Sequence, residues 1–182
     1  MAIVESTPIT IGSTMPNFEL KSPDGETFNN QKLIGENGLI IVFTCNHCPY
    51  AQAIWERVIS IADQAEKLGI KTVAINPNIH QDYPEDSPEE MKKLIQKLEI
   101  KFPYLVDEIQ QTAKEYKAQC TPDIYLLDND GKLVYHGRVD DNWQDKHSVT
   151  SHELLAAVNA LANGLEINKE QKPSLGCSIK WR

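Results

Sequence analysis

The sequence predicts an α/β fold with a largely parallel central sheet and antiparallel strands at its edges. Short apolar runs alternate with stretches of helical periodicity through most of the chain. Residues 38–43 (GLIIVF) form a continuous apolar run rich in β-branched residues, which is typical of a strand buried on both faces of a parallel sheet. Near both ends of the chain, two short strand-like runs flank a turn sequence, and this arrangement predicts an antiparallel hairpin.

Length and composition are those of an ordinary globular protein. The 182 residues, of which 41% are hydrophobic and 24% charged, fit one domain. We expect a single domain over residues 1–182, with a lead-in over 1–12 and a tail over 165–182. The net charge of −8 argues against binding to nucleic acid or to an anionic membrane surface, because both select basic faces.

The N-terminal half supplies a hairpin and the first βαβ unit. Residues 17–20 and 26–28 flank Ser-Pro-Asp-Gly at 22–25, a turn sequence that predicts a hairpin. After the apolar strand, hydrophobic residues recur at helical spacing, and Gly69 ends the pattern. They are Ile54, Val58, Ile61, Ala62, Ala65 and Leu68. Residues 72–75 predict the next strand, and residues 76–86 a polar loop.

Ser87 begins the clearest helix signal. Ser87 can cap, Pro88 suits the first helical position and Glu90 completes a capping box. The apolar stripe that follows comprises Met91, Leu94, Ile95 and Leu98. Residues 104–106 predict a further strand, and Asp107 is placed to cap a short helix reaching about residue 117.

The last elements are a second hairpin and a helix. Residues 123–127 and 132–136 are strand-like and flank Asp-Asn-Asp-Gly. Residues 150–163 predict a helix, because Thr150 and Glu153 have capping-box spacing and Gly164 can end it.

The strongest chemical signal is residues 44–49 (TCNHCP), between a buried strand and a long helix. The N-terminus of a helix favours an anion, and cysteine pKa values fall there. Cys45 and Cys48 are spaced to close and reopen a small disulfide ring, and His47 between them can tune their pKa by its positive charge. In a βαβ context such a pair predicts redox chemistry.

Two other interpretations of the cysteines are possible. The pair could be half of a zinc site, although no second pair completes four ligands unless the fold gathers Cys120 and Cys177. Alternatively, the thiols could be inert packing groups. We find no secretory signal and no apolar window of 18 residues, so we expect a cytoplasmic protein with reduced thiols.

Several motifs together resemble the thioredoxin-like redoxin superfamily, and more narrowly a peroxiredoxin-like subgroup of cytosolic proteins related to alkyl hydroperoxide reductase and thiol-specific antioxidant. The resemblance runs from about residue 12 to residue 182 and implies a thioredoxin fold, with a central mixed sheet flanked by helices and an N-terminal β-hairpin extension. The motifs are MPNFEL at 15–20 with DG at 24–25, FTCNHCPY at 43–50, CTPD at 120–123, HGRVDD at 136–141 and GCSIKW at 176–181.

The resemblance also implies a second part of the site. Thr121 and Pro122 are expected to be joined by a cis peptide bond beside the cysteine pair, in a loop that offers substrate backbone a pairing edge. Cys120 would then lie near the pair as a third thiol or as a small buried residue. Cys177 could resolve an oxidised cysteine or pack at the domain edge.

The two family analogies disagree on the attacking cysteine. In thioredoxins the first cysteine, here Cys45, attacks and the second resolves. In peroxiredoxins the attacking cysteine precedes a proline, which points to Cys48. That pattern also has Thr or Ser three residues earlier, where this chain has Cys45, and an arginine before the strand at 123, where this chain has Thr121-Pro122. We therefore favour Cys45.

The resulting hypothesis is an enzyme, a thiol–disulfide oxidoreductase, whose redox pair is Cys45 and Cys48. Its substrates would be protein disulfides or hydroperoxides, an external thiol would reduce it, and no cofactor is required. The alternatives are a peroxiredoxin-like peroxidase with an antioxidant role, with sulfenic acid on Cys48 or Cys45, and a thiolate metal-binding protein that uses Cys45, Cys48 and Cys120.

Overall fold

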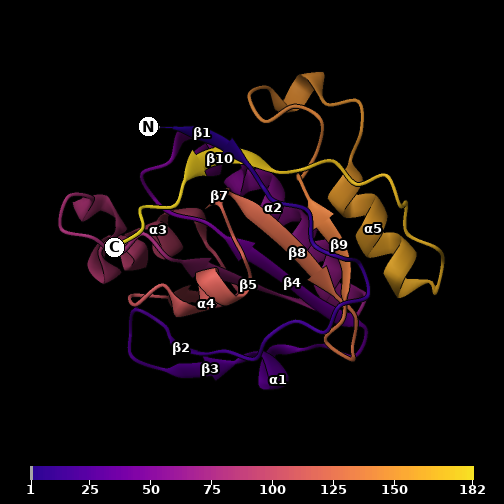
Figure 1. Cartoon of the computed structure of the whole chain (residues 1–182), viewed down its shortest axis with the longest axis horizontal. Coiled ribbons are helices and arrows are strands. Elements are labelled where there is room, and N and C mark those ends of the chain that lie inside the picture. Colours follow the sequence, from indigo (N-terminus) through magenta and orange to yellow (C-terminus); the bar gives the residue numbers. More distant parts are fainter. Residues whose placement is uncertain (1) are drawn as a thin grey trace.

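The computed structural model describes residues 2–182 and contains the expected α/β architecture (Figure 1). A seven-stranded mixed sheet has the order β3-β2-β6-β5-β4-β8-β9, in which β4, β5 and β6 are parallel. Its strands are β2 (Glu19–Lys21), β3 (Thr27–Asn29), β4 (Gly38–Phe43), β5 (Ile70–Asn76), β6 (Tyr104–Val106), β8 (Asp123–Leu127) and β9 (Leu133–Gly137).

The central strand β4 confirms the prediction for residues 38–43. All six residues are buried, and successive side chains point to opposite faces of the sheet, as the strand period of two requires. Leu39, Ile41 and Phe43 join the core on one face, while Ile40 and Val42 join the core on the other. Both faces are therefore covered, and the strand ends at the cysteine motif.

Helices cover the two faces unequally. The long helix α2 (Pro49–Lys67) and the helix α5 (Glu153–Ala162) pack on the face of Ile40 and Val42. The helix α3 (Pro88–Leu98) packs against α2 through Met91 and Trp55, and Ser87 caps it by accepting the Glu90 N–H, as predicted. On the other face lie α1 (Asn30–Leu33) and α4 (Gln111–Glu115), and the β2–β3 hairpin at the edge of the sheet packs Leu20 and Phe28 against the same core.

Two helix starts differ from the prediction. Helix α5 begins at Glu153 with His152 at its cap, because the Thr150 hydroxyl instead donates to Asp141. Helix α4 begins at Gln111 with Gln110 at its cap, although Asp107 still accepts the N–H groups of Thr112 and Ala113. Short 3₁₀ turns occupy Pro84–Asp86 and Lys146–Ser148.

The lead-in and the tail contain regular structure that the sequence did not suggest. The strands β1 (Ile3–Glu5), β10 (Leu175–Ser178) and β7 (Cys120–Thr121) form a small antiparallel sheet in the order β1-β10-β7. Figure 1 shows β1 in indigo and β10 in yellow side by side above the central sheet. Both ends of the chain therefore meet beside the loop that follows β7. Among residues 2–182, no helix combines the length and apolar character that a membrane span requires.

Candidate active site

The cysteine motif lies where β4 ends and α2 begins. Cys48 is the N-cap residue of α2, with extended backbone angles (φ −76°, ψ 122°), and Pro49 is the first helical residue. A residue before proline avoids the helical region, which explains why the helix starts there. The sulfur nearest the helix N-terminus is therefore that of Cys48.

The loop after β7 contacts both sulfurs. The Thr121–Pro122 peptide bond is cis, as the resemblance implied. The Oγ1 atom of Thr121 lies 3.2 Å from Sγ of Cys45, and Sγ of Cys48 lies 3.0 Å from the Thr121 carbonyl oxygen. The structure thus brings together Cys45, Cys48, Thr121 and Pro122, which sequence analysis placed in one site.

The other two cysteines lie near the pair but play different parts. All four thiols are free and at most 2% exposed. Cys177 packs directly with Cys45 and Cys48. In contrast, the thiol of Cys120 donates to the Pro122 carbonyl at 3.3 Å, and burial raises its pKa far above the usual range.

The pKa values of the two motif thiols move in opposite directions. Hydrogen bonding from the Cys45 thiol is the largest of the influences that lower the pKa of Cys48 to about 5, and the Cys177 thiol and the N–H groups of Ala51 and Cys177 act in the same sense. Burial opposes this shift. Burial, the bond to Cys48 and the Asp86 charge raise the pKa of Cys45 well above its usual range. The lowered pKa thus belongs to Cys48, whereas the sequence analysis favoured Cys45 as the attacking cysteine.

Asp86 is a site residue that sequence analysis missed. Its buried carboxylate accepts the Asn46 backbone N–H at 2.6 Å and the Asn76 side-chain amide at 3.2 Å, and it pairs with Nδ1 of His47. The Asn46 side chain also accepts the Tyr104 hydroxyl at 3.0 Å. Asp86 thus holds the loop between the two cysteines, although it follows that loop by 40 residues in sequence. Only its place before the helix cap at Ser87 marked it in the sequence.

His47 is engaged differently from the expectation. Its ring pairs with Asp86 and stacks on Tyr83 with 4.5 Å between ring centroids. It does not appear among the leading influences on the pKa of Cys48. The contacts of His47 thus tie the loop between the two cysteines to Asp86 and Tyr83.

One group within residues 2–182 combines three types of metal ligand. Ligand atoms of Cys45, His47 and Asp86 lie within 4.8 Å of one another. This set differs from the set of Cys45, Cys48 and Cys120 expected for the metal-binding alternative. Nδ1 of His47 bonds directly to the Asp86 carboxylate, whereas the buried Nε2 atom of His47 has no hydrogen-bond partner.

The low pKa of Cys48 predicts a pH-dependent stability. Between about pH 5 and pH 9 the thiol is ionised in the folded state and protonated in the unfolded state, so the unfolded state binds more protons. The free energy of unfolding of the reduced protein should therefore rise with pH over this window, relative to Cys48→Ser, by at most about 1.4 kcal/mol per pH unit.

Urea unfolding at several pH values measures this difference. Cys120→Ser is the matched control, because a thiol whose pKa is raised stays protonated in both states below pH 9 and adds no slope. A difference between wild type and Cys48→Ser that does not change with pH would contradict the thiolate assignment.

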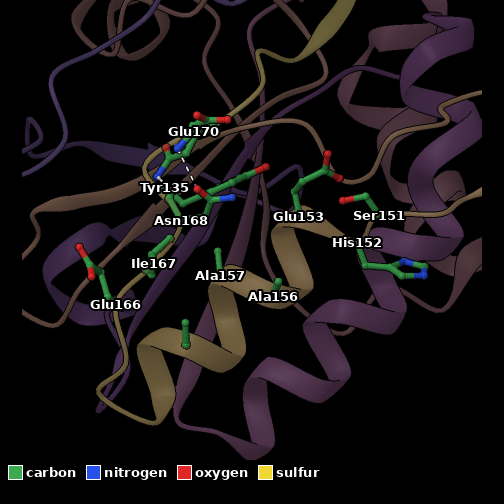
Figure 2. Close-up of a pocket in the computed structure, with 12 residues that line it drawn as sticks. Tyr135, Ser151, His152, Glu153, Ala156, Ala157, Glu166, Ile167, Asn168 and Glu170 are labelled. Carbon is green, nitrogen blue, oxygen red and sulfur yellow. Dashed lines mark hydrogen bonds between the residues drawn. The ribbon is translucent and has the colours of Figure 1, made fainter.

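Two cavities of the described residues lie at different distances from the cysteine pair along the fold: one is remote from the cis-proline loop and the other borders it. One cavity has a volume of about 310 Å³, and no cysteine lines it. Figure 2 shows its lining residues on α5 and on the segment at 166–170, with Tyr135 at the wall. A second cavity of about 380 Å³ borders the thiol site, because Pro122, Trp143 and Leu175 contribute to its wall. This second cavity therefore offers an approach to the cis-proline loop.

Comparisons with known proteins agree with this geometry. The model of the AhpC/TSA family matches residues 11–136. An uncharacterized conserved protein from Geobacillus kaustophilus has a crystal structure that is 41% identical, with a TM-score of 0.94, covering 100% of this chain and 97% of that one. No curated protein compared with this sequence matches it.

More distant structures share the fold. A peroxidoxin from Mycobacterium tuberculosis is 15% identical with a TM-score of 0.61, covering 86% of this chain and 96% of its own. A secreted disulfide oxidoreductase from the same organism is 17% identical with a TM-score of 0.60, covering 79% and 95%. The mixed sheet, the flanking helices and these neighbours establish the thioredoxin-like fold. With its family match over most of the chain, the protein belongs to the AhpC/TSA family of thioredoxin-like redoxins.

Proposed function

We propose that this protein is a thiol–disulfide oxidoreductase in which Cys48 is the attacking thiolate and Cys45 is the resolving thiol. The observation that carries the proposal is the asymmetry of the pair. Sγ of Cys48 lies at the N-terminus of α2 and has a pKa lowered to about 5, whereas Cys45 keeps its proton and hydrogen-bonds to it. A thiolate beside a protonated thiol is the resting state that disulfide exchange requires.

The reaction follows from these two protonation states. The Cys48 thiolate attacks one sulfur of a substrate disulfide, and the other substrate sulfur leaves as a thiolate. Cys45 then gives its proton to that leaving group and attacks Sγ of Cys48. This forms the Cys45–Cys48 disulfide and releases the second substrate thiolate. An external dithiol, as found in the cytoplasm, returns the pair to the reduced state.

The site must open for an external substrate to reach the sulfurs. Both sulfurs belong to residues with 0% exposure, and β10 pairs with β7 at the loop that was expected to offer substrate a pairing edge. The cavity beside Pro122, Trp143 and Leu175 borders this covered edge. We infer that protein disulfides approach from that side and displace β10.

A peroxidase is the second candidate, and one observation favours it. Cys48 precedes Pro49 at a helix N-terminus, which is the peroxiredoxin pattern that the sequence resembles. In this case the Cys48 thiolate attacks a hydroperoxide, the alcohol or water leaves, and sulfenic acid forms on Cys48. Cys45 then attacks this sulfur and water leaves, so the same Cys45–Cys48 disulfide results. An antioxidant role would follow from this activity.

Parallel assays on one reduced preparation distinguish the two candidates. We expect multiple turnovers of insulin disulfides with dithiothreitol as the reductant, and slower consumption of hydrogen peroxide and cumene hydroperoxide. Cys120→Ser should match the wild type in both assays. Fast peroxide consumption without disulfide turnover would replace the proposal with the peroxidase. Inactivity in both assays, with a folded protein and free thiols, would overturn both candidates.

A further inference from the structure

The pairing of β10 with β7 places Cys177 beside Cys45 and Cys48. In the ladder between β10 and β7, Cys177 lies opposite Thr121, the residue whose side chain and carbonyl contact the two motif sulfurs. Cys177 is 2% exposed and belongs to the same packed cluster as Cys45, Cys48 and Ala51. The register between β10 and β7 thus fixes the position of Cys177 relative to Thr121, which contacts the sulfurs of Cys45 and Cys48.

A glycine allows β10 to lie this close to the loop. A Cβ atom at Gly176 would be 2.2 Å from the Thr121 carbonyl oxygen and 3.0 Å from the Pro122 nitrogen, and these are backbone atoms that cannot rotate away. On its other side β10 pairs with β1, with Val4 opposite Gly176 and Ile3 opposite Cys177. The strand that carries Cys177 is therefore held between β1 and the cis-proline loop.

Cys48 packs in one cluster with the other two thiols, those of Cys45 and Cys177. Both of these thiols also act to lower the pKa of Cys48. Cys120 lies on β7 as well, but its ladder partner is Ser178, and its thiol donates to the Pro122 carbonyl. The structure therefore selects Cys177, and not Cys120, as the third thiol that can react with Cys48.

We propose that Cys177 is a third redox thiol, which exchanges with the Cys45–Cys48 disulfide to form a Cys48–Cys177 disulfide. This inference rests on the proposed function, which supplies the Cys45–Cys48 disulfide. Cys177 loses its proton and attacks Sγ of Cys48, the Cys45–Cys48 bond breaks, and Cys45 leaves as a thiolate that takes up the proton. One disulfide replaces another, so no outside oxidant is consumed. The product shields Cys48 beneath β10 and frees Cys45.

Disulfide mapping in variants tests this exchange. The reduced protein is treated with one equivalent of diamide, which accepts two electrons from two thiols, then quenched in acid, alkylated and mapped by peptide mass. In the wild type we expect both the Cys45–Cys48 and the Cys48–Cys177 disulfides. In Cys45→Ser we expect Cys48–Cys177 as the main product, and Cys120→Ser should give the wild-type pattern.

Two outcomes separate this inference from the proposed function. Turnover of insulin disulfides by the wild type, with no Cys48–Cys177 bond in either wild type or Cys45→Ser, would overturn the third-thiol proposal alone. Failure of Cys177→Ser to form the Cys45–Cys48 disulfide under the same oxidation would overturn the proposed function, and the inference with it.

A second variant tests the role of strand placement while keeping all four thiols. Gly176→Val should push β10 away from the Thr121 carbonyl, lower the yield of Cys48–Cys177 at least tenfold and leave Cys45–Cys48 formation in place. Ser178→Ala on the same strand is the matched control and should keep the wild-type yield. An unchanged Cys48–Cys177 yield in a folded Gly176→Val protein would contradict the proposed dependence on the β10–β7 register.

Discussion

Cys48→Ser is expected to lower the turnover of insulin disulfides at least about 10³-fold, because it removes the nucleophile itself. A serine hydroxyl stays protonated near neutral pH, whereas the pKa of Cys48 is lowered to about 5. Cys45→Ser should instead trap the reaction after the first attack. Its Cys48 can still attack a disulfide once, but no resolving thiol from the motif follows, so a mixed disulfide with substrate or a bond to Cys177 should accumulate.

Mass spectrometry after a single addition of a disulfide-containing peptide separates these variants. Cys45→Ser should carry an adduct or bond at Cys48, and Cys48→Ser should carry no adduct at Cys45. Cys120→Ser is the control and should keep turnover within about twofold of the wild type, because its thiol faces the Pro122 carbonyl instead of the pair. An adduct on Cys45 in Cys48→Ser, with turnover maintained, would identify Cys45 as the attacker and reverse our assignment.

Asp86→Ala is expected to destabilise the reduced protein by about 3–5 kcal/mol, because it removes one buried acceptor that several neighbouring groups share. Its carboxylate accepts from the Asn46 backbone and the Asn76 amide, and pairs with His47. Loss of this acceptor leaves buried donors without partners. The Asp86 charge also raises the pKa of Cys45, so the variant should lower that pKa.

Urea unfolding monitored by circular dichroism measures the stability change. Asp86→Asn keeps an acceptor for the Asn46 N–H, and it should recover more than half of the loss. Asp82→Ala is the surface control from the same loop, because the Asp82 side chain is 80% exposed, and it should change stability by less than about 0.5 kcal/mol. Equal effects of Asp86→Ala and Asp82→Ala would show that the buried carboxylate does not organise the loop.

Local sequence patterns predicted most of the helices and strands, because helix capping, turn formation and hydrophobic periodicity depend on residues that are close in the sequence. The apolar run of β4 and the Ser87 cap of α3 both appear where the pattern placed them. The turn sequences at 22–25 and 128–131 also join the expected hairpin strands. Strands β1 and β10 escaped prediction because neither is apolar enough to indicate burial, and their stability depends on pairing with each other across the whole chain.

The amino-acid sequence by itself determined the fold class, the spacing of the cysteine pair and the position of Cys48 at a helix start, because helix capping and the constraint before proline act within a few residues. Only the tertiary structure decided which thiol ionises and which residues surround it. Cys48 meets Thr121 across 73 residues, and Asn46 meets Asp86 across 40. Sheet register, set by the packing of both faces of the central strands, creates these contacts. Since a pKa depends on burial and on such neighbours, it cannot be derived from spacing along the chain.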